Sequence, residues 1–221
     1  MGGKLLPDLG ADLALVWVWP RRDLSRQGAS AEDVAGSPTK SDWEVRRRLL
    51  ATYLGVGPAA IDISRTSCGK PTLSGRSDLH FNSTRSATFE GFAIARAPVG
   101  VDLEEHWETP IDEVDGLAEL VLSPREKEQF ELLTPDMRRG FYLRCWTRRE
   151  AYLKAVGDGL SHAVLPQTVI PESGAFAGLP PRTRTTWTVW EEEPFPGCFL
   201  AVVAGSPVFR SQVLAGGPPG C

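Results

Sequence analysis

The chain has 221 residues, of which 42% are hydrophobic and 24% are charged, and its net charge of -4 gives no global basic field of the kind that marks a nucleic-acid binder. No apolar run is long enough to span a bilayer, and residues 1–20 lack the basic start and long apolar centre of a secretion signal. The cysteines form no CxxC pair and no zinc spacing, so we expect reduced thiols in a cytoplasmic protein.

The first part of the chain predicts a strand, a helix and a second strand. Residues 12–20 are rich in valine and tryptophan and stop at a proline, which is typical of a strand. Residues 21–40 are polar and small, and predict a loop. A Ser-Asp cap and a final glycine predict a helix over 41–55. A short strand over 60–64 and a turn-rich connection over 68–81 are expected to follow.

The rest of the chain predicts strands, then helices, then strands. Strands over 87–96 and 99–105 are expected to pair like a hairpin around Pro98. The further predictions are helices over 112–122, 123–133 and 136–156, an antiparallel strand pair over 185–193 and 198–205, and a disordered tail over 215–221. Ser123 and Glu126 form a capping-box pattern at the start of the second of these helices. This order of elements predicts an α+β fold with helices packed on antiparallel sheets.

Two carboxylates alternate in the sequence VGVDLEE. Because side chains alternate along a strand, Asp102 and Glu104 project from one face while Val101 and Leu103 project from the other. A hard divalent cation would relieve the repulsion between the carboxylates, and magnesium favours such oxygen ligands. The alternative interpretation is a strand end that emerges into solvent, and the spacing alone favours it.

A helix face over 144–160 carries Trp146, Glu150 and Lys154 at spacings that place them on one side. The pair Glu150 and Lys154 also has the favoured order for a surface ion pair, which contributes only about 0.3–0.5 kcal/mol. The tryptophan favours partial burial of this face. Arginines cluster beside it at 148–149 and on the earlier helix at 46–48, and such local clusters suit a small anionic ligand.

Two polar turns are further candidates for a ligand-binding site. Lys70 stands between Gly69 and Pro71, where the alternative is an ordinary exposed turn lysine. Residues 80–86 gather hydroxyl, amide and guanidinium groups that suit a phosphate, and the alternative is a polar turn before the next strand.

In order, the chain contains the motifs GKP, FNSTRS, VGVDLE and WTRREAYLKAVGDGL. Together they resemble the 4′-phosphopantetheinyl transferase superfamily, specifically its monomeric two-lobed type, over roughly 39–160. The resemblance implies two similar lobes related by a pseudo-twofold axis, with the active site in the cleft between them. We expect an N-terminal coenzyme A-binding lobe over 1–100, a C-terminal metal-binding and catalytic lobe over 101–210, and a flexible tail over 211–221.

The resemblance also implies an activity. Family members move the phosphopantetheine arm of coenzyme A onto a serine of an apo acyl or peptidyl carrier protein, and release adenosine 3′,5′-bisphosphate. We therefore expect a magnesium-dependent or manganese-dependent cytoplasmic transferase of polyketide or nonribosomal-peptide biosynthesis. Coenzyme A and the carrier protein would be its partners, without nucleic acid or membrane.

The resemblance assigns roles to the site residues. Asp102, Glu104 and Glu150 match the metal ligands, and Glu150 also matches a general base for the carrier serine. Lys154 matches the lysine that neutralises or protonates the leaving phosphate. The positions expected to contact coenzyme A are Thr39, Arg47, Lys70, Thr84, Arg85, Asp102 and Lys154.

One motif departs from the family pattern FN-x-S-H-S. Thr84 keeps the hydroxyl, whereas Arg85 replaces a histidine that touches the 3′-phosphate of coenzyme A. Arginine is always charged and binds phosphate in a bidentate way. Two alternatives stay open: a repurposed protein that binds coenzyme A or carrier protein without transfer, and an unrelated metal-dependent phosphohydrolase.

Overall fold

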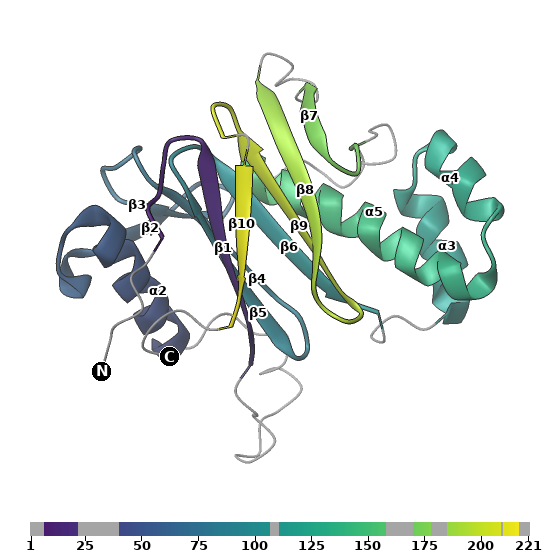
Figure 1. Cartoon of the computed structure of the whole chain (residues 1–221), viewed down its shortest axis with the longest axis horizontal. Helices are drawn as coiled ribbons and strands as arrows, with labels where there is room; N and C mark the ends of the chain where they lie inside the picture. The colour runs from purple at the N-terminus through teal and green to yellow at the C-terminus, as the bar shows by residue number, and fades with distance from the viewer. Residues whose placement is uncertain are drawn as a thin grey trace.

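Groups of strands and groups of helices follow one another along the chain, in the mixed order that the sequence predicts (Figure 1). The computed structural model describes residues 7–21, 40–106, 111–157, 170–177, 185–208 and 210–216. The elements are β1 (Leu13–Pro20), α2 (Lys40–Leu54), η2 (Pro58–Ala60), β2 (Ile63–Arg65), β3 (Pro71–Leu73), β4 (His80–Arg85), β5 (Phe89–Ala95), β6 (Val99–Glu105), α3 (Ile111–Val121), α4 (Pro124–Glu131), α5 (Pro135–Val156), β7 (Gly174–Ala177), β8 (Thr186–Phe195), β9 (Cys198–Gly205) and β10 (Arg210–Ala215). The predicted α+β class is confirmed.

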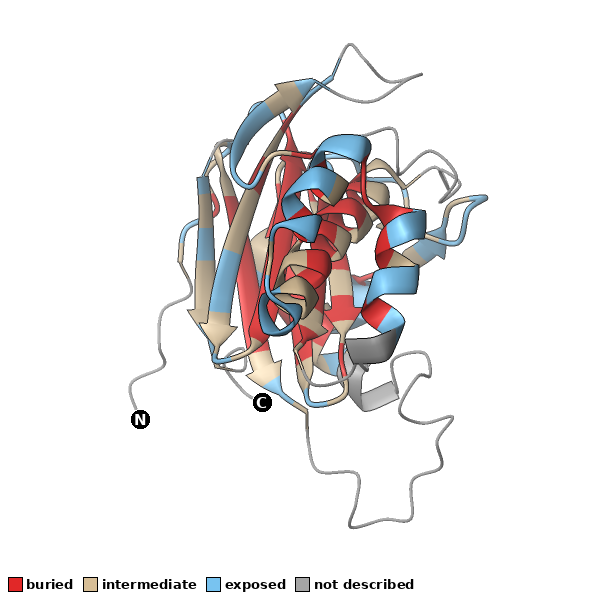
Figure 2. Cartoon of the chain, turned by 90° about the vertical axis from the view of Figure 1, so that its right-hand side faces the viewer, coloured by how far each residue is buried: buried red, intermediate tan, exposed pale blue. Residues whose placement is uncertain are grey.

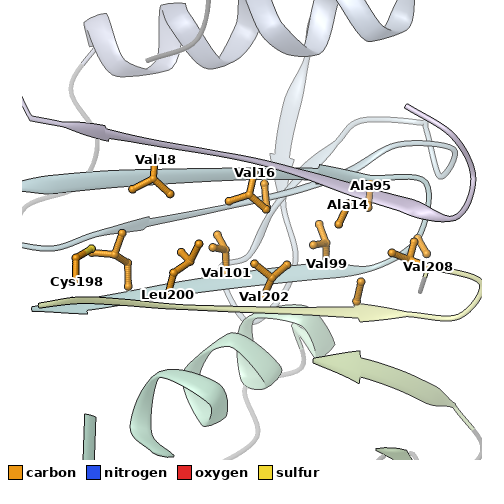
Figure 3. Packing of buried hydrophobic residues seen from close by; sticks show 14 residues of the cluster. Ala14, Val16, Val18, Ala95, Val99, Val101, Cys198, Leu200, Val202 and Val208 are labelled. Atoms are coloured by element: carbon orange, nitrogen blue, oxygen red, sulfur yellow. The ribbon is translucent and has the colours of Figure 1, made fainter. Parts of the chain in front are cut away.

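Two four-stranded sheets form the centre of the fold. Their strand orders are β10-β1-β5-β4 and β6-β9-β8-β7, and β2 and β3 form a separate small sheet. The two large sheets face each other across buried aliphatic side chains, among them Val16, Ala95, Val101 and Val202, which Figure 3 shows from close by. Apolar side chains fill most of this space.

Helices cover the outer faces of both sheets. Leu49 and Leu50 of α2 pack against Trp17 and Phe92 of the first sheet. The helix α5 lies on the second sheet, where its alanines and Tyr152 pack against strands β8 and β9. The helices α3 and α4 pack on the first half of α5 (Figure 1). Figure 2 shows exposed residues on the outer sides of these helices and buried residues on the strands behind them. The layers are therefore helix, sheet, sheet and helix.

Local sequence signals fix the ends of several elements as predicted. The strand over 12–20 is confirmed as β1, and the helix over 41–55 as α2. The capping box is confirmed, because Ser123 Oγ accepts from the Glu126 amide and the Glu126 carboxylate accepts from the Ser123 amide. The helix over 136–156 is confirmed as α5, which ends at Gly157 with a φ of 71°.

The predicted hairpin between the strands around Pro98 is wrong. The strand β5 pairs with β1 on one edge and with β4 on the other, and β6 instead pairs with β9 in the second sheet. Both edges of β5 are already occupied, so β6 has no edge of β5 to pair with. The connection around Pro98 therefore carries the chain from one sheet to the other, and both strands supply side chains to the core between the sheets.

The predicted flexible tail is wrong for residues 211–215, which belong to β10. This strand pairs with β1 in parallel, so the first sheet is not wholly antiparallel. The predicted end of the C-terminal lobe at 210 also does not separate the two sheets, because β10 belongs to the first sheet. Half-buried Val213 and Leu214 pack against the two cores on either side of the first sheet, which explains why this polar segment is ordered there. Residues 217–221 lie outside the described part of the chain, and the pseudo-twofold relation of two lobes stays a prediction.

Among the described helices, none is both long and apolar enough to cross a membrane.

Cysteine accessibility gives a first testable prediction. The three cysteines in the described ranges are free thiols, of which Cys68 is exposed while Cys145 and Cys198 are buried. Burial raises the pKa of Cys145 and of Cys198 to about 12. Because the thiolate is the reactive form, iodoacetamide at pH 8 is expected to label Cys68 and to spare the other two until urea unfolds the protein. Peptide mapping by mass spectrometry measures this, and labelling of Cys198 as fast as Cys68 in the native protein would contradict it.

Candidate active site

The strand β6 presents two different faces. Val101 and Leu103 enter the core between the sheets. Asp102 lies on the opposite face, toward α5, and is only 4% exposed, and Glu104 on the same face contacts Trp146 of α5. The alternation predicted from the sequence is confirmed, and the alternative of a strand end that emerges into solvent is wrong for Asp102.

Gly100 brings the backbone of α5 directly onto β6. A Cβ atom at Gly100 would lie 2.0 Å from the carbonyl oxygen of Ala151 and 2.3 Å from the amide nitrogen of Ala155. Such distances leave no space for any side chain. Glu150 and Lys154 each precede one of these alanines, so the close approach also places them beside the carboxylates of β6.

Asp102 and Lys154 form the centre of the polar cluster. Asp102 Oδ1 accepts hydrogen bonds from Lys154 Nζ at 2.5 Å and from Thr84 Oγ1 at 3.1 Å. Thr84 comes from β4, so the cluster lies where the first sheet meets the edge of the second. Asp102 Oδ2 is buried and has no hydrogen-bond partner among the described residues. A buried carboxylate oxygen of this kind calls for a further ligand.

The two glutamates add negative charge around this pair. Glu104 Oε1 accepts a hydrogen bond of 3.1 Å from Trp146 Nε1. Burial alone would lower the pKa of Lys154, but the charge and hydrogen bond of Asp102, with the charges of Glu150 and Glu104, outweigh it and raise that pKa. Burial together with the charges of Glu104 and Glu150 raises the pKa of Tyr142 to about 12. Lys154 is therefore a stable ammonium within a carboxylate-rich environment.

The carboxylates of this cluster meet some of the requirements of a magnesium site. In the described ranges, no three His, Cys, Asp or Glu side chains stand close enough to form a complete metal cage. Magnesium seldom uses such a cage, because it binds one or two carboxylates and completes its shell with water and substrate phosphates. The unpartnered oxygen of Asp102 fits this requirement, and Glu104 on β6 and Glu150 on α5 are further carboxylates whose charges act on Lys154.

Most other residues predicted to contact coenzyme A form contacts away from the Asp102–Lys154 pair. Arg85 pairs with Glu90 directly across the strand pair β4–β5 at 3.0 Å. The guanidinium of Arg47 donates to the Ile61 carbonyl. Lys70 Nζ donates to two backbone carbonyls at the end of α5 and the start of β6. Thr39 lies outside the described residues. Among the predicted coenzyme A contacts that the structure describes, only Thr84 is brought to Asp102 and Lys154.

Comparison with known proteins places this chain in a family. The model of the 4′-phosphopantetheinyl transferase superfamily matches residues 98–196. The phosphopantetheinyl transferase HetI of Nostoc sp. is 34% identical over 167 residues, which cover 73% of this chain and 68% of that protein. The chain belongs to the 4′-phosphopantetheinyl transferase superfamily. A Bacillus subtilis 4′-phosphopantetheinyl transferase is 30% identical over 52% of this chain and 50% of its own length, and Sfp of Bacillus subtilis is 23% identical over 76% and 73%.

The superfamily match spans part of the cluster. Residues 98–196 include Asp102, Glu104, Glu150 and Lys154, which are the positions on β6 and α5. Thr84 precedes the matched range, although its hydroxyl reaches Asp102. The matched range therefore contains the junction of β6 and α5, where these contacts lie.

Three residues near the site have structural roles that the sequence did not predict. Asn82 Oδ1 accepts from the Val101 amide at 3.0 Å and thereby ties β4 to β6. Glu90, which joins Arg85 and buried Arg46, carried no signal beyond its place in an apolar strand. The close packing at Gly100 had only the glycine itself as a signal.

The arginine pair on α5 does not form an anion site, contrary to the sequence prediction. Arg149 is fully buried and binds Glu126, and Arg148 binds Glu191 at 2.7 Å. Burial alone would raise the pKa of Glu126, but the hydrogen bonds and charge of Arg149, with hydrogen bonds from Ser123, hold it below its usual value. These ion pairs hold α4 and β8 against α5.

Glu126→Ala is therefore expected to destabilise the protein by about 3–5 kcal/mol, because it leaves the Arg149 charge buried without its carboxylate. Urea denaturation measures the free energy of unfolding. Glu128→Ala is the matched control on the same helix, since Glu128 is exposed. A depressed pKa adds stability above the unfolded value of about 4.5, so the difference between wild type and Glu126→Ala is expected to shrink as the pH falls through the folded pKa. A difference that is small at pH 7 would contradict the buried pair.

Proposed function

We propose that the chain transfers the 4′-phosphopantetheine arm of coenzyme A to a serine of an apo acyl or peptidyl carrier protein and releases adenosine 3′,5′-bisphosphate. The observation that carries this proposal is the Asp102–Lys154 pair, which β6 and α5 hold beside Glu104 and Glu150. The superfamily membership supports the same activity, because the matching relatives are named as phosphopantetheinyl transferases.

The residues of this cluster fit the proposed reaction. The serine oxygen forms a bond to the pantetheine-side phosphorus, and the bond from that phosphorus to the bridging oxygen breaks, so that the electron pair leaves with adenosine 3′,5′-bisphosphate. Glu150 accepts the serine proton as general base. Lys154 stabilises the negative charge that grows on the leaving phosphate. Asp102, with Glu104 and Glu150, would hold magnesium or manganese, which would supply further positive charge to the reaction.

The carboxylates around Lys154 raise its pKa and so favour its charged form. An ammonium that three carboxylates stabilise keeps its proton at neutral pH. Lys154 therefore offers a positive charge to the leaving phosphate. The 30% exposure of its side chain leaves it able to reach a phosphate that enters from solvent.

The coenzyme is proposed to bind at the first-sheet side of the cluster. Thr84 on β4 contacts both Asp102 and Lys154, and Arg85 follows it on the opposite face of the strand, paired with Glu90. Arg85 offers a guanidinium for the 3′-phosphate in place of the family histidine. The roles of Thr39 and Arg47 at the adenosine end stay predictions. We also expect a cytoplasmic monomer that acts in polyketide or nonribosomal-peptide biosynthesis.

One observation favours a second candidate function. Arg85 is engaged by Glu90, and a phosphate would have to share the guanidinium with this carboxylate. If it cannot, the protein would bind carrier protein or coenzyme A without transfer. The superfamily membership favours either of these functions over an unrelated phosphohydrolase.

Chromatographic detection of the nucleotide product separates the two functions. Incubation with an apo carrier protein, coenzyme A and magnesium is expected to release adenosine 3′,5′-bisphosphate in proportion to the carrier. A carrier with its acceptor serine replaced by alanine is the control and is expected to give none. Absence of this nucleotide with several carriers, while coenzyme A binds, would establish the repurposed binding protein instead.

A further inference from the structure

Lys70 occupies an unusual place for a turn lysine, because its side chain runs into the interior. Its amine donates to the carbonyl oxygen of Ala155 at 2.8 Å and to that of Val99 at 3.3 Å. Ala155 belongs to the last turn of α5, where carbonyls have no partner within the helix. An ammonium at the negative end of a helix is favourable. The amine therefore joins the end of α5 to the start of β6.

These two elements carry the proposed active site. Val99 opens β6, the strand of Asp102 and Glu104, and Ala155 directly follows Lys154 on α5. Gly100 lies next to Val99 and contacts the backbone of Ala155. The amine of Lys70 thus lies at the closest approach of β6 and α5 and binds the backbone of both.

The base of this side chain is held firmly. The backbone amide of Lys70 donates to Thr66 Oγ1 at 3.1 Å, and the Lys70 carbonyl accepts from the Thr66 amide at 2.9 Å. The side chain also packs on Gly157, where a Cβ atom would lie 2.5 Å from Lys70 Cδ. Lys70 therefore has little freedom to turn toward another ligand.

We propose that Lys70 is a positioning residue, which fixes the last turn of α5 on β6 so that Glu150 and Lys154 meet Asp102. This inference rests on the proposed transferase function, and it replaces the predicted role of Lys70 as a phosphate ligand. Burial lowers the pKa of Lys70 to about 8, whereas carboxylates raise that of Lys154. The two lysines therefore stand in different environments and serve different purposes.

The test compares Lys70→Met and Lys70→Arg with wild type at a temperature where all are folded. Lys70→Met is expected to lower kcat by about 10²-fold, because a small misplacement of catalytic groups has this effect. Its Kd for coenzyme A, measured by calorimetry, is expected to stay within about 2-fold of wild type, since positioning acts on the reacting groups rather than on binding. Amide protons of residues 153–157 are expected to exchange faster. Lys70→Arg keeps donors for both carbonyls and is expected to recover part of kcat.

Lys127→Met is the matched control. Lys127 Nζ also donates to a carbonyl in the last turn of a helix, that of Glu119 on α3, at 2.8 Å, but no proposed site residue lies there. Its kcat is expected to equal that of wild type. The Kd for coenzyme A could instead rise about 10-fold or more in Lys70→Met while kcat is unchanged. This result would overturn the proposal and show that Lys70 is a phosphate ligand. Unchanged kcat and unchanged exchange would overturn it as well.

The exchange measurement keeps this inference separate from the proposed function. If wild type transfers nothing to any carrier, the transferase proposal fails, and faster exchange at 153–157 in Lys70→Met still tests the contact with α5. If wild type is active and Lys70→Met matches it in kcat and exchange, the positioning proposal fails and the transferase proposal stands.

Discussion

Gly100→Ala is expected to prevent the native packing of α5 on β6. The added methyl group would lie 2.0 Å from the Ala151 carbonyl oxygen and 2.9 Å from the Ala155 Cα atom. These are backbone atoms in the C-terminal part of α5, which cannot turn aside as a flexible side chain can. The helix as a whole would have to move away from the strand, and its contacts with the second sheet would be lost. We expect a loss of more than about 4 kcal/mol in the free energy of unfolding.

Urea denaturation followed by circular dichroism measures this loss. Gly116→Ala on α3 is the matched control, because a Cβ atom at Gly116 meets nothing within 4 Å. Alanine is the better helix former, so this control is expected to gain about 0.5–1 kcal/mol. A Gly100→Ala protein that unfolds at the same urea concentration as wild type would show that α5 does not lie directly on β6.

Asp102→Asn is expected to lower the rate of transfer by about 10³-fold, in line with the effect of removing one electrostatic group from an active site. Asparagine has the same size as aspartate and can still accept the hydrogen bond from Thr84. It removes the negative charge that holds Lys154 and that would bind the metal. The folded structure is expected to persist, because the 30% exposed side chain of Lys154 can reach solvent.

Single-turnover transfer at saturating coenzyme A measures this rate. Asp115→Asn is the control, since Asp115 forms an exposed ion pair with Arg138 on the outer helices and contacts no site residue in the described ranges. It is expected to transfer at the wild-type rate. An Asp102→Asn protein that keeps a tenth or more of the wild-type rate would remove Asp102 from the proposed chemistry.

The sequence predicted those features that depend on short-range patterns. The alternation along β6 placed Asp102 and Glu104 on one face, because a strand that packs on a core at one face fixes the side of every residue. The spacing of Glu150 and Lys154 placed them together on α5, and capping residues gave the ends of α4 and α5. Each of these signals lies within a few residues of the feature that it predicts.

The features that the sequence did not predict depend on contacts between distant segments. The pairing of β10 with β1 joins the two ends of the described chain, and its half-buried residues give no clear strand pattern. Arg149 resembled an anion ligand because its partner, Glu126, lies on another helix. The sequence could not show the contact of Lys70 with α5, because the carbonyl that it binds belongs to Ala155, far along the chain. The tertiary structure decides which charges are already paired.

The intact mass of an apo carrier protein, measured after incubation with this protein, coenzyme A and magnesium, tests the central claim most directly. The account predicts a gain of one phosphopantetheine per carrier, which disappears with a chelator and in the Glu150→Ala variant, and which shows that Arg85 is tolerated. Folding of Glu150→Ala is checked by circular dichroism. No gain in mass across several acyl and peptidyl carriers, with coenzyme A still bound, would contradict the transferase account.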